Sequence, residues 1–184
     1  MLPTTENLKQ TGGRHLARIV LEEEVIQRRV RDLGRQITAA YPSGDLLVLG
    51  LLKGSFIFLS DLVRRIERPL QVDFLVAASY GTGTVSGGDV RLLYEPETTL
   101  EGRHILLVED IVDTGKTLTR LVDLLRRRAP ESLEVCALLH KHLAPRLPLE
   151  PRFVGFDVPP DFLVGYGLDH AENFRHLPYI ASLT

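Results

Sequence analysis

The segment from His104 to Leu118 constrains the fold of this chain more than any other part of it. Ile105 to Val108 is an unbroken run of apolar, mostly branched residues with the length of a strand, and it leads into two adjacent carboxylates, Glu109 and Asp110. Such a run is typical of a strand buried on both faces of a parallel sheet. Open α/β sheets bind their ligands at the carboxyl ends of the strands. We therefore expect the two acids to face a ligand.

The residues that follow form a small polar loop in front of a helix. The loop reads Asp113-Thr114-Gly115-Lys116-Thr117, and the apolar residues after it recur at helical spacing: Leu118, Leu121, Val122, Leu124 and Leu125. A loop of small residues at a helix N-terminus presents free backbone N–H groups and the positive end of the helix dipole, which together favour phosphate. Acids beside a phosphate site predict a ligand that also carries hydroxyl groups or a metal ion, such as a phosphosugar.

The nucleotide-binding P-loop is the main alternative for this loop. Gly115-Lys116-Thr117 matches the last three positions of its pattern, G-x-x-x-x-G-K-S/T. The first glycine of that pattern would be at position 110, which is Asp110. Because a carboxylate there would face a triphosphate instead of cradling it, the P-loop interpretation fails.

The composition is that of a soluble globular protein of one domain, 1–184. The chain has 184 residues, 44% of them hydrophobic and 25% charged. Its 22 basic and 24 acidic residues give a net charge of −2, which offers no support for a nucleic-acid partner.

Cysteine content and apolar segments bear on the cellular location. Cys136 is the only cysteine and lies in the apolar run 133–139, so we expect a buried thiol and no disulfide within the chain. The N-terminus lacks the apolar core of a signal peptide, and the longest apolar segment, 46–52, is too short to span a bilayer. We expect a cytoplasmic protein that does not enter a membrane.

Hydrophobic periodicity predicts alternating strands and helices. We expect helices over 20–40, 55–66 and from about 116, and strands over 46–52, 72–78, 90–95, 105–108, 133–139, 153–158 and 162–166. Four glycines within 80–89 argue against a fixed conformation there. The alternation predicts an α/β fold, with a parallel sheet and helices on both of its faces.

The stretch V-E-D-I-V-D-T-G-K-T resembles the signature of the type I phosphoribosyltransferases, in particular their hypoxanthine-guanine branch of bacterial type. The resemblance extends over residues 15–182. It implies a twisted, five-stranded parallel core, a small hood made from the N- and C-terminal segments, and a flexible glycine-rich lid loop. It also implies that the 5′-phosphate of the substrate binds the loop Asp113, Thr114, Gly115, Lys116 and Thr117.

Two further segments resemble binding elements of this family. Leu52-Lys53-Gly54-Ser55 looks like the pyrophosphate loop, in which the peptide before the lysine is cis in many members. Ser79 and Tyr80 look like the Ser-Tyr pair of the catalytic lid, and we expect residues 82–89 to be mobile without ligand. A lid suits the reaction because water would trap the ribosyl cation.

The base pocket is implied by a third set of matches. At the place of Lys141 the family has a lysine that donates to the purine 6-oxo group, and at the place of Phe162 an aromatic ring that stacks on the base. The backbone around Leu163 and Asp169 would face the purine edge, and Arg175 would reach the pyrophosphate. His170 stands where the family usually has tyrosine. The six histidines show no spacing typical of a metal site, so we interpret them as non-ligands.

The resemblance implies transfer of the phosphoribosyl group from 5-phosphoribosyl-1-pyrophosphate to hypoxanthine or guanine, which is purine salvage. Asp113 would exchange a proton with the base, and Glu109 and Asp110 would hold the ribose hydroxyls, directly or through metal. Mg²⁺ is the implied cofactor, with Glu109, Asp110 and Asp169 as its ligands. We also expect a homo-oligomer, a dimer or a tetramer.

Two other functions fit these residues less well. A sugar-phosphate-binding regulator on the same fold would need an added DNA-binding domain or a basic RNA face, and neither is evident here. A pyrimidine phosphoribosyltransferase is disfavoured by Lys141, Phe162 and Asp169.

Overall fold

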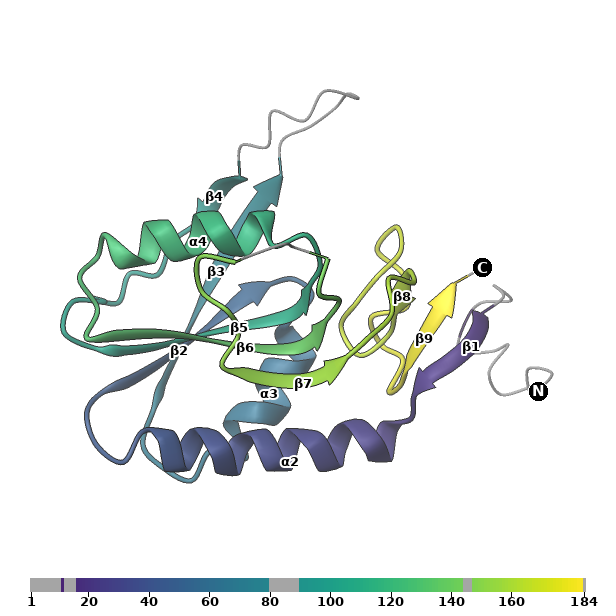
Figure 1. The fold of residues 1–184 in the computed structure, drawn as a ribbon, viewed down its shortest axis with the longest axis horizontal. Coiled ribbons are helices and arrows are strands. Elements are labelled where there is room, and N and C mark those ends of the chain that lie inside the picture. Colours follow the sequence, from purple (N-terminus) through teal and green to yellow (C-terminus); the bar gives the residue numbers. More distant parts are fainter. Residues whose placement is uncertain (1–10, 12–15, 80–89, 144–146, 184) are drawn as a thin grey trace.

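A computed structural model describes residue 11 and residues 16–79, 90–143 and 147–183. In these residues a six-stranded sheet has the order β4-β3-β2-β5-β6-β7 (Figure 1). Strand β4 pairs antiparallel with β3, whereas all other neighbours in this sheet pair in parallel. The mostly parallel sheet confirms the predicted α/β class. Its strands are β2 (Leu46–Leu52), β3 (Gln71–Ser79), β4 (Val90–Tyr94), β5 (His104–Val112), β6 (Ser132–His140) and β7 (Phe153–Asp157).

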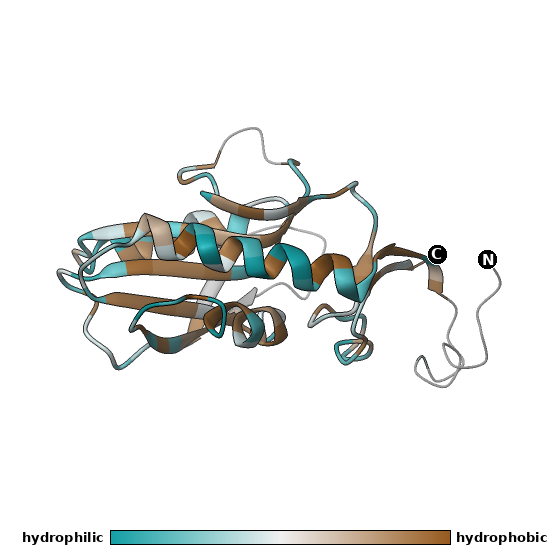
Figure 2. Ribbon diagram, turned by 90° about the horizontal axis from the view of Figure 1, so that it is seen from below, coloured by the Kyte–Doolittle hydropathy of each residue, from teal (hydrophilic) through white to brown (hydrophobic). Residues whose placement is uncertain are grey.

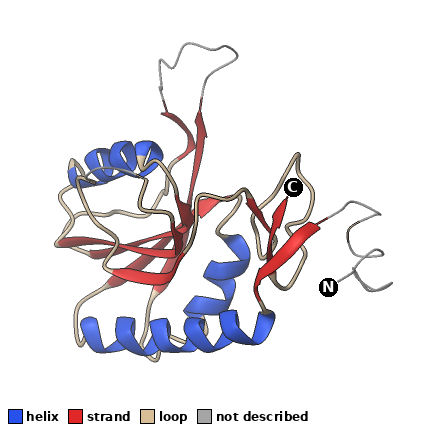
Figure 3. Cartoon of the chain, turned by 45° about the vertical axis from the view of Figure 1, so that its right-hand side comes forward, coloured by secondary structure: helices blue, strands red, loops and turns tan. Residues whose placement is uncertain are grey.

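Helices cover both faces of this sheet, as expected. Helix α4 (Lys116–Arg126) lies on one face, and α2 (Glu23–Ala40) and α3 (Phe56–Val63) lie on the other (Figures 1 and 3). Successive residues of a strand point to opposite faces. In β2, Leu47 and Leu49 therefore join the core under α4, while Val48 joins the core under α2 and α3.

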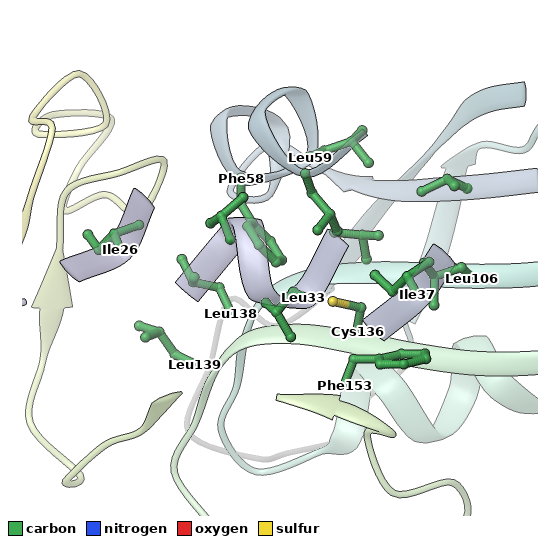
Figure 4. Packing of buried hydrophobic residues seen from close by; sticks show 14 of the residues in the cluster. Ile26, Leu33, Ile37, Phe58, Leu59, Leu106, Cys136, Leu138, Leu139 and Phe153 are labelled. Carbon is green, nitrogen blue, oxygen red and sulfur yellow. The ribbon is translucent and has the colours of Figure 1, made fainter. Parts of the chain in front are cut away.

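The larger core is built from aliphatic side chains of α2 and α3 against the strands. Figure 4 shows Ile26, Leu33 and Ile37 from α2 and Phe58 from α3 packed over strand residues that include Cys136. Figure 2 shows hydrophilic residues along the outward side of α2 and hydrophobic strands behind it. The Cys136 thiol is buried, as expected, and burial raises its pKa far above its ordinary value. Each fully buried aliphatic side chain contributes about 1.5–3 kcal/mol, so this packing is a main source of stability.

A second, smaller sheet joins the two ends of the described chain. It has the order β1-β9-β8, from β1 (Leu16–Leu21), β9 (Ile180–Leu183) and β8 (Leu163–Val164), and its strands pair antiparallel. In Figure 1 it lies beyond the carboxyl ends of β5, β6 and β7. This sheet is the hood that the resemblance implied, and its position puts it beside the expected ligand site.

Several elements differ from the sequence prediction in their ends or in their presence. Val20 and Leu21 belong to β1 and not to the first helix, because Leu21 pairs with Ile180 of β9. Helix α3 is shorter than expected, and β8 contains two residues where five were expected. The sequence prediction contained neither β1 nor β9. The differences at β1, β8 and β9 arise because pairing with a distant segment, and not local periodicity, decides the conformation there.

Strand β5 also extends beyond its predicted end. It continues to Val112, so Glu109 and Asp110 lie inside the strand and not after it. Pairing with β6 holds this extension, since Glu109 lies opposite Ala137 and Val112 opposite His140. Within the described residues, no helix is long and apolar enough to cross a membrane.

Candidate active site

A pocket opens where β5 leads into α4. Its volume is about 270 Å³. Sequence analysis had singled out most of its lining, namely Glu109, Asp110, Asp113, Thr114, Gly115, Lys116 and Thr117. Leu51, Ala77, Ile111, Val112 and Leu118 also line it and had not been predicted as site residues. The carboxyl ends of β2, β3 and β5 thus meet at one cavity, as the parallel arrangement requires.

The two acids of β5 lie in an environment that disfavours their charge. Glu109 is buried, and Asp110 is half-buried. Burial, and next the negative charge of Asp110, raise the pKa of Glu109 well above its usual range. Burial raises the pKa of Asp110 to about 6, although the backbone N–H of Ile111 and the cation of Arg175 oppose this shift. A positive charge brought into the pocket would favour the ionised form of both acids.

The loop between β5 and α4 has the geometry of an anion site. Gly115 precedes the first residue of α4 and has a φ of 71°, a left-handed conformation that glycine adopts without strain. Its carbonyl accepts hydrogen bonds from the backbone N–H and the side-chain hydroxyl of Thr119. The first amides of a helix have no partner within the helix, and Gly115 supplies no side-chain cap, so these amides can face a ligand at the positive end of α4.

The predicted pyrophosphate loop packs directly against β5. The Leu52-Lys53 peptide is cis, as the resemblance implied. A Cβ atom at Gly54 would lie 1.6 Å from Oδ2 of Asp110, so only glycine fits there without moving that carboxylate. The carbonyl of Gly54 faces Gly167, where a Cβ atom would approach it to 2.1 Å. Two glycines thus bring the loop, β5 and the hood segment into contact.

Arg175 and Asp169 are brought together at the hood side of the pocket. Nη2 of Arg175 lies 2.7 Å from Oδ1 of Asp169, and its Nη1 donates to the carbonyl of Gly167 at 2.8 Å. Both charged side chains are largely shielded from solvent, which strengthens their attraction. The pair therefore holds Asp169 beside Asp110, whose charge both residues influence.

Glu172 is a site residue that sequence reasoning missed. Its carboxylate accepts hydrogen bonds from Nζ of Lys53 at 3.1 and 3.2 Å and lies 3.4 Å from Nη2 of Arg175. These interactions, first of all the hydrogen bond from Lys53, lower the pKa of Glu172. Lys53 and Arg175 are the two cations expected to bind pyrophosphate, and an anionic side chain lies between them. Its spacing of three residues from Arg175 is the only sequence signal that could have indicated it.

Lys141 and Asp113 meet across the ends of β6 and β5. Nζ of Lys141 lies 3.2 Å from Oδ2 of Asp113. The lysine side chain is 9% exposed, whereas the Asp113 side chain is 46% exposed. The cation is thus shielded while the carboxylate remains open to a ligand. Lys141 follows the end of β6, and its backbone N–H donates to the carbonyl of Val112.

The aromatic residue predicted to stack on the base, Phe162, is exposed to solvent. Phe162 is 54% exposed, which is unusual for phenylalanine, and its ring meets the ring of His170 edge-on at 5.4 Å between centroids. The next residue, Leu163, is buried in β8. An exposed phenylalanine ring can stack on a planar ligand.

Comparison with known proteins assigns the chain to a family. Residues 18–171 match the family described as the phosphoribosyl transferase domain. The hypoxanthine-guanine phosphoribosyltransferase of Bacillus subtilis is 43% identical over 168 residues, which cover 91% of this chain and 93% of that protein. The chain belongs to the phosphoribosyltransferase family.

Two further relatives show how far the similarity extends. A solved structure of a hypoxanthine phosphoribosyltransferase from Staphylococcus aureus has a TM-score of 0.87 and 41% identity, and the match covers 92% of each chain. The bifunctional protein TilS/HprT of Listeria innocua is 42% identical over 181 residues. The match covers 97% of this chain but 28% of the Listeria protein, so the chain spans little more than a quarter of that relative.

The lid expected for a phosphoribosyltransferase is outside the described part of the chain. Ser79 is the last residue of β3, and Tyr80 and residues 82–89 lie beyond the described residues. Their predicted roles stay predictions.

Proposed function

We propose that this chain transfers the phosphoribosyl group of 5-phosphoribosyl-1-pyrophosphate to hypoxanthine or guanine, giving IMP or GMP and pyrophosphate. The observation that carries the proposal is the contact between Lys141 and Asp113 at the edge of a pocket lined by the phosphate loop and the acids of β5. The family of the chain and the names of its relatives in Bacillus subtilis and Staphylococcus aureus support the same reaction.

The sugar phosphate would bind along the floor of the pocket. Backbone N–H groups of residues 113–117 would hold the 5′-phosphate at the N-terminus of α4, with the Thr114 and Thr117 hydroxyls beside them. Glu109 and Asp110 would accept hydrogen bonds from the ribose hydroxyls, and Lys53, the amide of Gly54 and Arg175 would face the pyrophosphate. Cations and amides at that place stabilise the charge of the leaving group.

The donor set of this pocket also suits Mg²⁺. Glu109, Asp110 and Asp169 offer the carboxylate oxygens that Mg²⁺ prefers, and in the described residues Oε1 of buried Glu109 has no hydrogen-bond partner. A hard cation would satisfy that oxygen and balance the three acids. We propose these residues as those that hold Mg²⁺, which when bound would neutralise negative charge on the pyrophosphate.

Asp113 would act as the general base. As N9 of the purine forms its bond to C1′ of the ribose, the bond from C1′ to the pyrophosphate oxygen breaks, and the base must lose the proton on N7. Asp113 is exposed on the ligand side and would accept that proton. The nearby ammonium group of Lys141 would hold the carboxylate in position before the base arrives.

Lys141 would also select the base. A shielded ammonium group donates to the 6-oxo group of hypoxanthine or guanine, whereas the 6-amino group of adenine offers it no acceptor. Phe162 would stack on the purine ring, and the backbone near Leu163 and Asp169 would face its edge. Uracil is too small to reach all of these groups at once.

An assay of the purified protein with Mg²⁺, the pyrophosphorylated sugar and five bases tests this function. We expect turnover with hypoxanthine and guanine, and little with adenine or uracil. Xanthine, the fifth base, tests whether a further 6-oxopurine is accepted. A protein that used uracil in preference to hypoxanthine would refute the proposal. The homo-oligomeric state and the cytoplasmic location stay predictions of the sequence.

A further inference from the structure

Two histidines and an aspartate gather at the ends of β6 and β7. Candidate ligand atoms of His140, His142 and Asp157 lie within 4.8 Å of one another. The imidazole rings are 3.8 Å apart between centroids, and Nε2 of His142 lies 2.6 Å from Oδ1 of Asp157. None of the three residues belongs to the candidate active site described above.

The register of the parallel strands builds this cluster. His140 and Asp157 are partners in the pairing of β6 with β7, so their side chains point to the same face of the sheet. His142 follows two residues later, in the loop after β6, where its φ is 52°. Lys141 lies between the two histidines and contacts Asp113 instead. The peptide 140–142 thus presents its lysine to the active site and its imidazoles to the cluster.

We propose that His140, His142 and Asp157 form a binding site for a divalent transition-metal ion such as Zn²⁺ or Co²⁺. Two imidazoles and one carboxylate are a donor set that these ions favour, and three protein ligands leave a position for water or an anion. Buried His140 would be the fixed ligand, whereas the side chains of His142 and Asp157 are 60% and 73% exposed and free to adjust.

The distances are compatible with metal coordination after a small adjustment. With metal–ligand bonds of about 2.0–2.2 Å, the ligand atoms of a tetrahedral site are roughly 3.3–3.6 Å apart. The separations here are at most 4.8 Å, so the widest must shorten by no more than about 1.5 Å. The contact between His142 and Asp157 must lengthen by a similar amount, which moves two exposed side chains and no strand.

This site differs in chemistry from the predicted Mg²⁺ site. The acids of β5 and Asp169 offer only oxygen ligands, which Mg²⁺ accepts, while imidazole nitrogen favours transition metals. An ion in the histidine site would link the end of β6 to β7 and would hold the peptide that carries Lys141. The two sites can therefore be tested separately.

The test is a titration of the purified full chain with Zn²⁺ in saturating Mg²⁺, followed by the NMR signals of the histidine rings and by calorimetry. His142→Asn and Asp157→Asn each remove one exposed ligand. His176→Asn serves as a control histidine outside the cluster, and Asp169→Asn removes a ligand of the predicted Mg²⁺ site. Thermal unfolding of each variant without Zn²⁺ verifies that it is folded.

We expect one Zn²⁺ to bind the wild-type protein and to shift the ring signals of His140 and His142. The dissociation constant should rise by at least about 10-fold in His142→Asn and in Asp157→Asn, since even indirect supporting contacts in metal sites contribute this much. It should change little in His176→Asn and Asp169→Asn. Unshifted histidine signals in the wild-type protein, or equal Zn²⁺ affinity in folded His142→Asn, would overturn the proposal.

Discussion

Nζ of Lys141 lies 3.2 Å from Oδ2 of Asp113, so the ends of β6 and β5 meet through an ion pair at the rim of the pocket. The two residues are 28 positions apart in sequence. They meet because parallel strands end at the same edge of the sheet. The proposed base-reading group and the proposed proton acceptor are thus held together before substrate binds.

Asp113→Asn should reduce kcat for hypoxanthine by about 10²- to 10⁴-fold, the usual contribution of a general base. Asparagine keeps the shape of the side chain but does not accept the proton. The affinity for the pyrophosphorylated sugar should be largely kept, as measured by equilibrium binding. Asp123→Asn, on the exposed side of α4, is the matched control and should behave as the wild type. Near-normal kcat in Asp113→Asn would remove Asp113 from its assigned role.

Gly54→Ala should impair use of the pyrophosphorylated sugar. The added methyl group would lie 1.6 Å from Oδ2 of Asp110, and that carboxylate must move to make room. A displacement of this size can lower kcat/KM by up to about 100-fold. Gly102→Ala is the control for a destabilising change without a clash, because a φ of 68° disfavours alanine there but no atom lies within 4 Å of the added group. Gly102→Ala should lose stability but keep its kcat/KM. A larger loss of kcat/KM in Gly102→Ala than in Gly54→Ala would contradict the packing argument.

Local sequence was sufficient to predict the centre of this fold. The apolar runs of β2, β5 and β6 have one structural solution, a strand buried between two layers of helices, and the loop at 113–117 marks the next helix. The strands of the hood could not be predicted from local sequence alone. Val20 and Leu21 fit a helical pattern, and only the pairing of β1 with β9, which lies some 160 residues away, makes them part of a strand.

In the candidate site, too, local sequence predicts some residues, while others depend on contacts with distant segments. Residues at strand ends were found from the sequence because strand ends locate ligands. Glu172 was missed because its role depends on Lys53, which the fold brings from a distant loop. The spacing of the histidines fits no common metal motif and predicts non-ligands, and only the register of β6 and β7 brings His140 beside Asp157.

Glu172→Gln should strengthen the binding of pyrophosphate by about two- to fivefold, the range expected when an exposed ion pair is removed. The Glu172 carboxylate occupies Lys53 and Arg175, the two cations proposed to bind pyrophosphate, and must release them when that ligand arrives. Calorimetry with pyrophosphate at low ionic strength measures the effect, which added salt should reduce. Glu131→Gln, an exposed glutamate just before β6, is the control. Weaker pyrophosphate binding in Glu172→Gln would show that Glu172 positions the cations instead of competing for them.

The most direct test of the account is kcat/KM for hypoxanthine and for adenine in the wild type, Lys141→Gln and Lys141→Met. Glutamine can present a donor or an acceptor, so it should weaken hypoxanthine use and relax the discrimination against adenine. Methionine offers neither, so Lys141→Met should have a lower kcat/KM for hypoxanthine without a higher kcat/KM for adenine. Sugar binding should change much less in both variants. The account predicts a lower hypoxanthine-to-adenine ratio in Lys141→Gln, and a ratio equal to that of the wild type would contradict the claim that Lys141 reads the base.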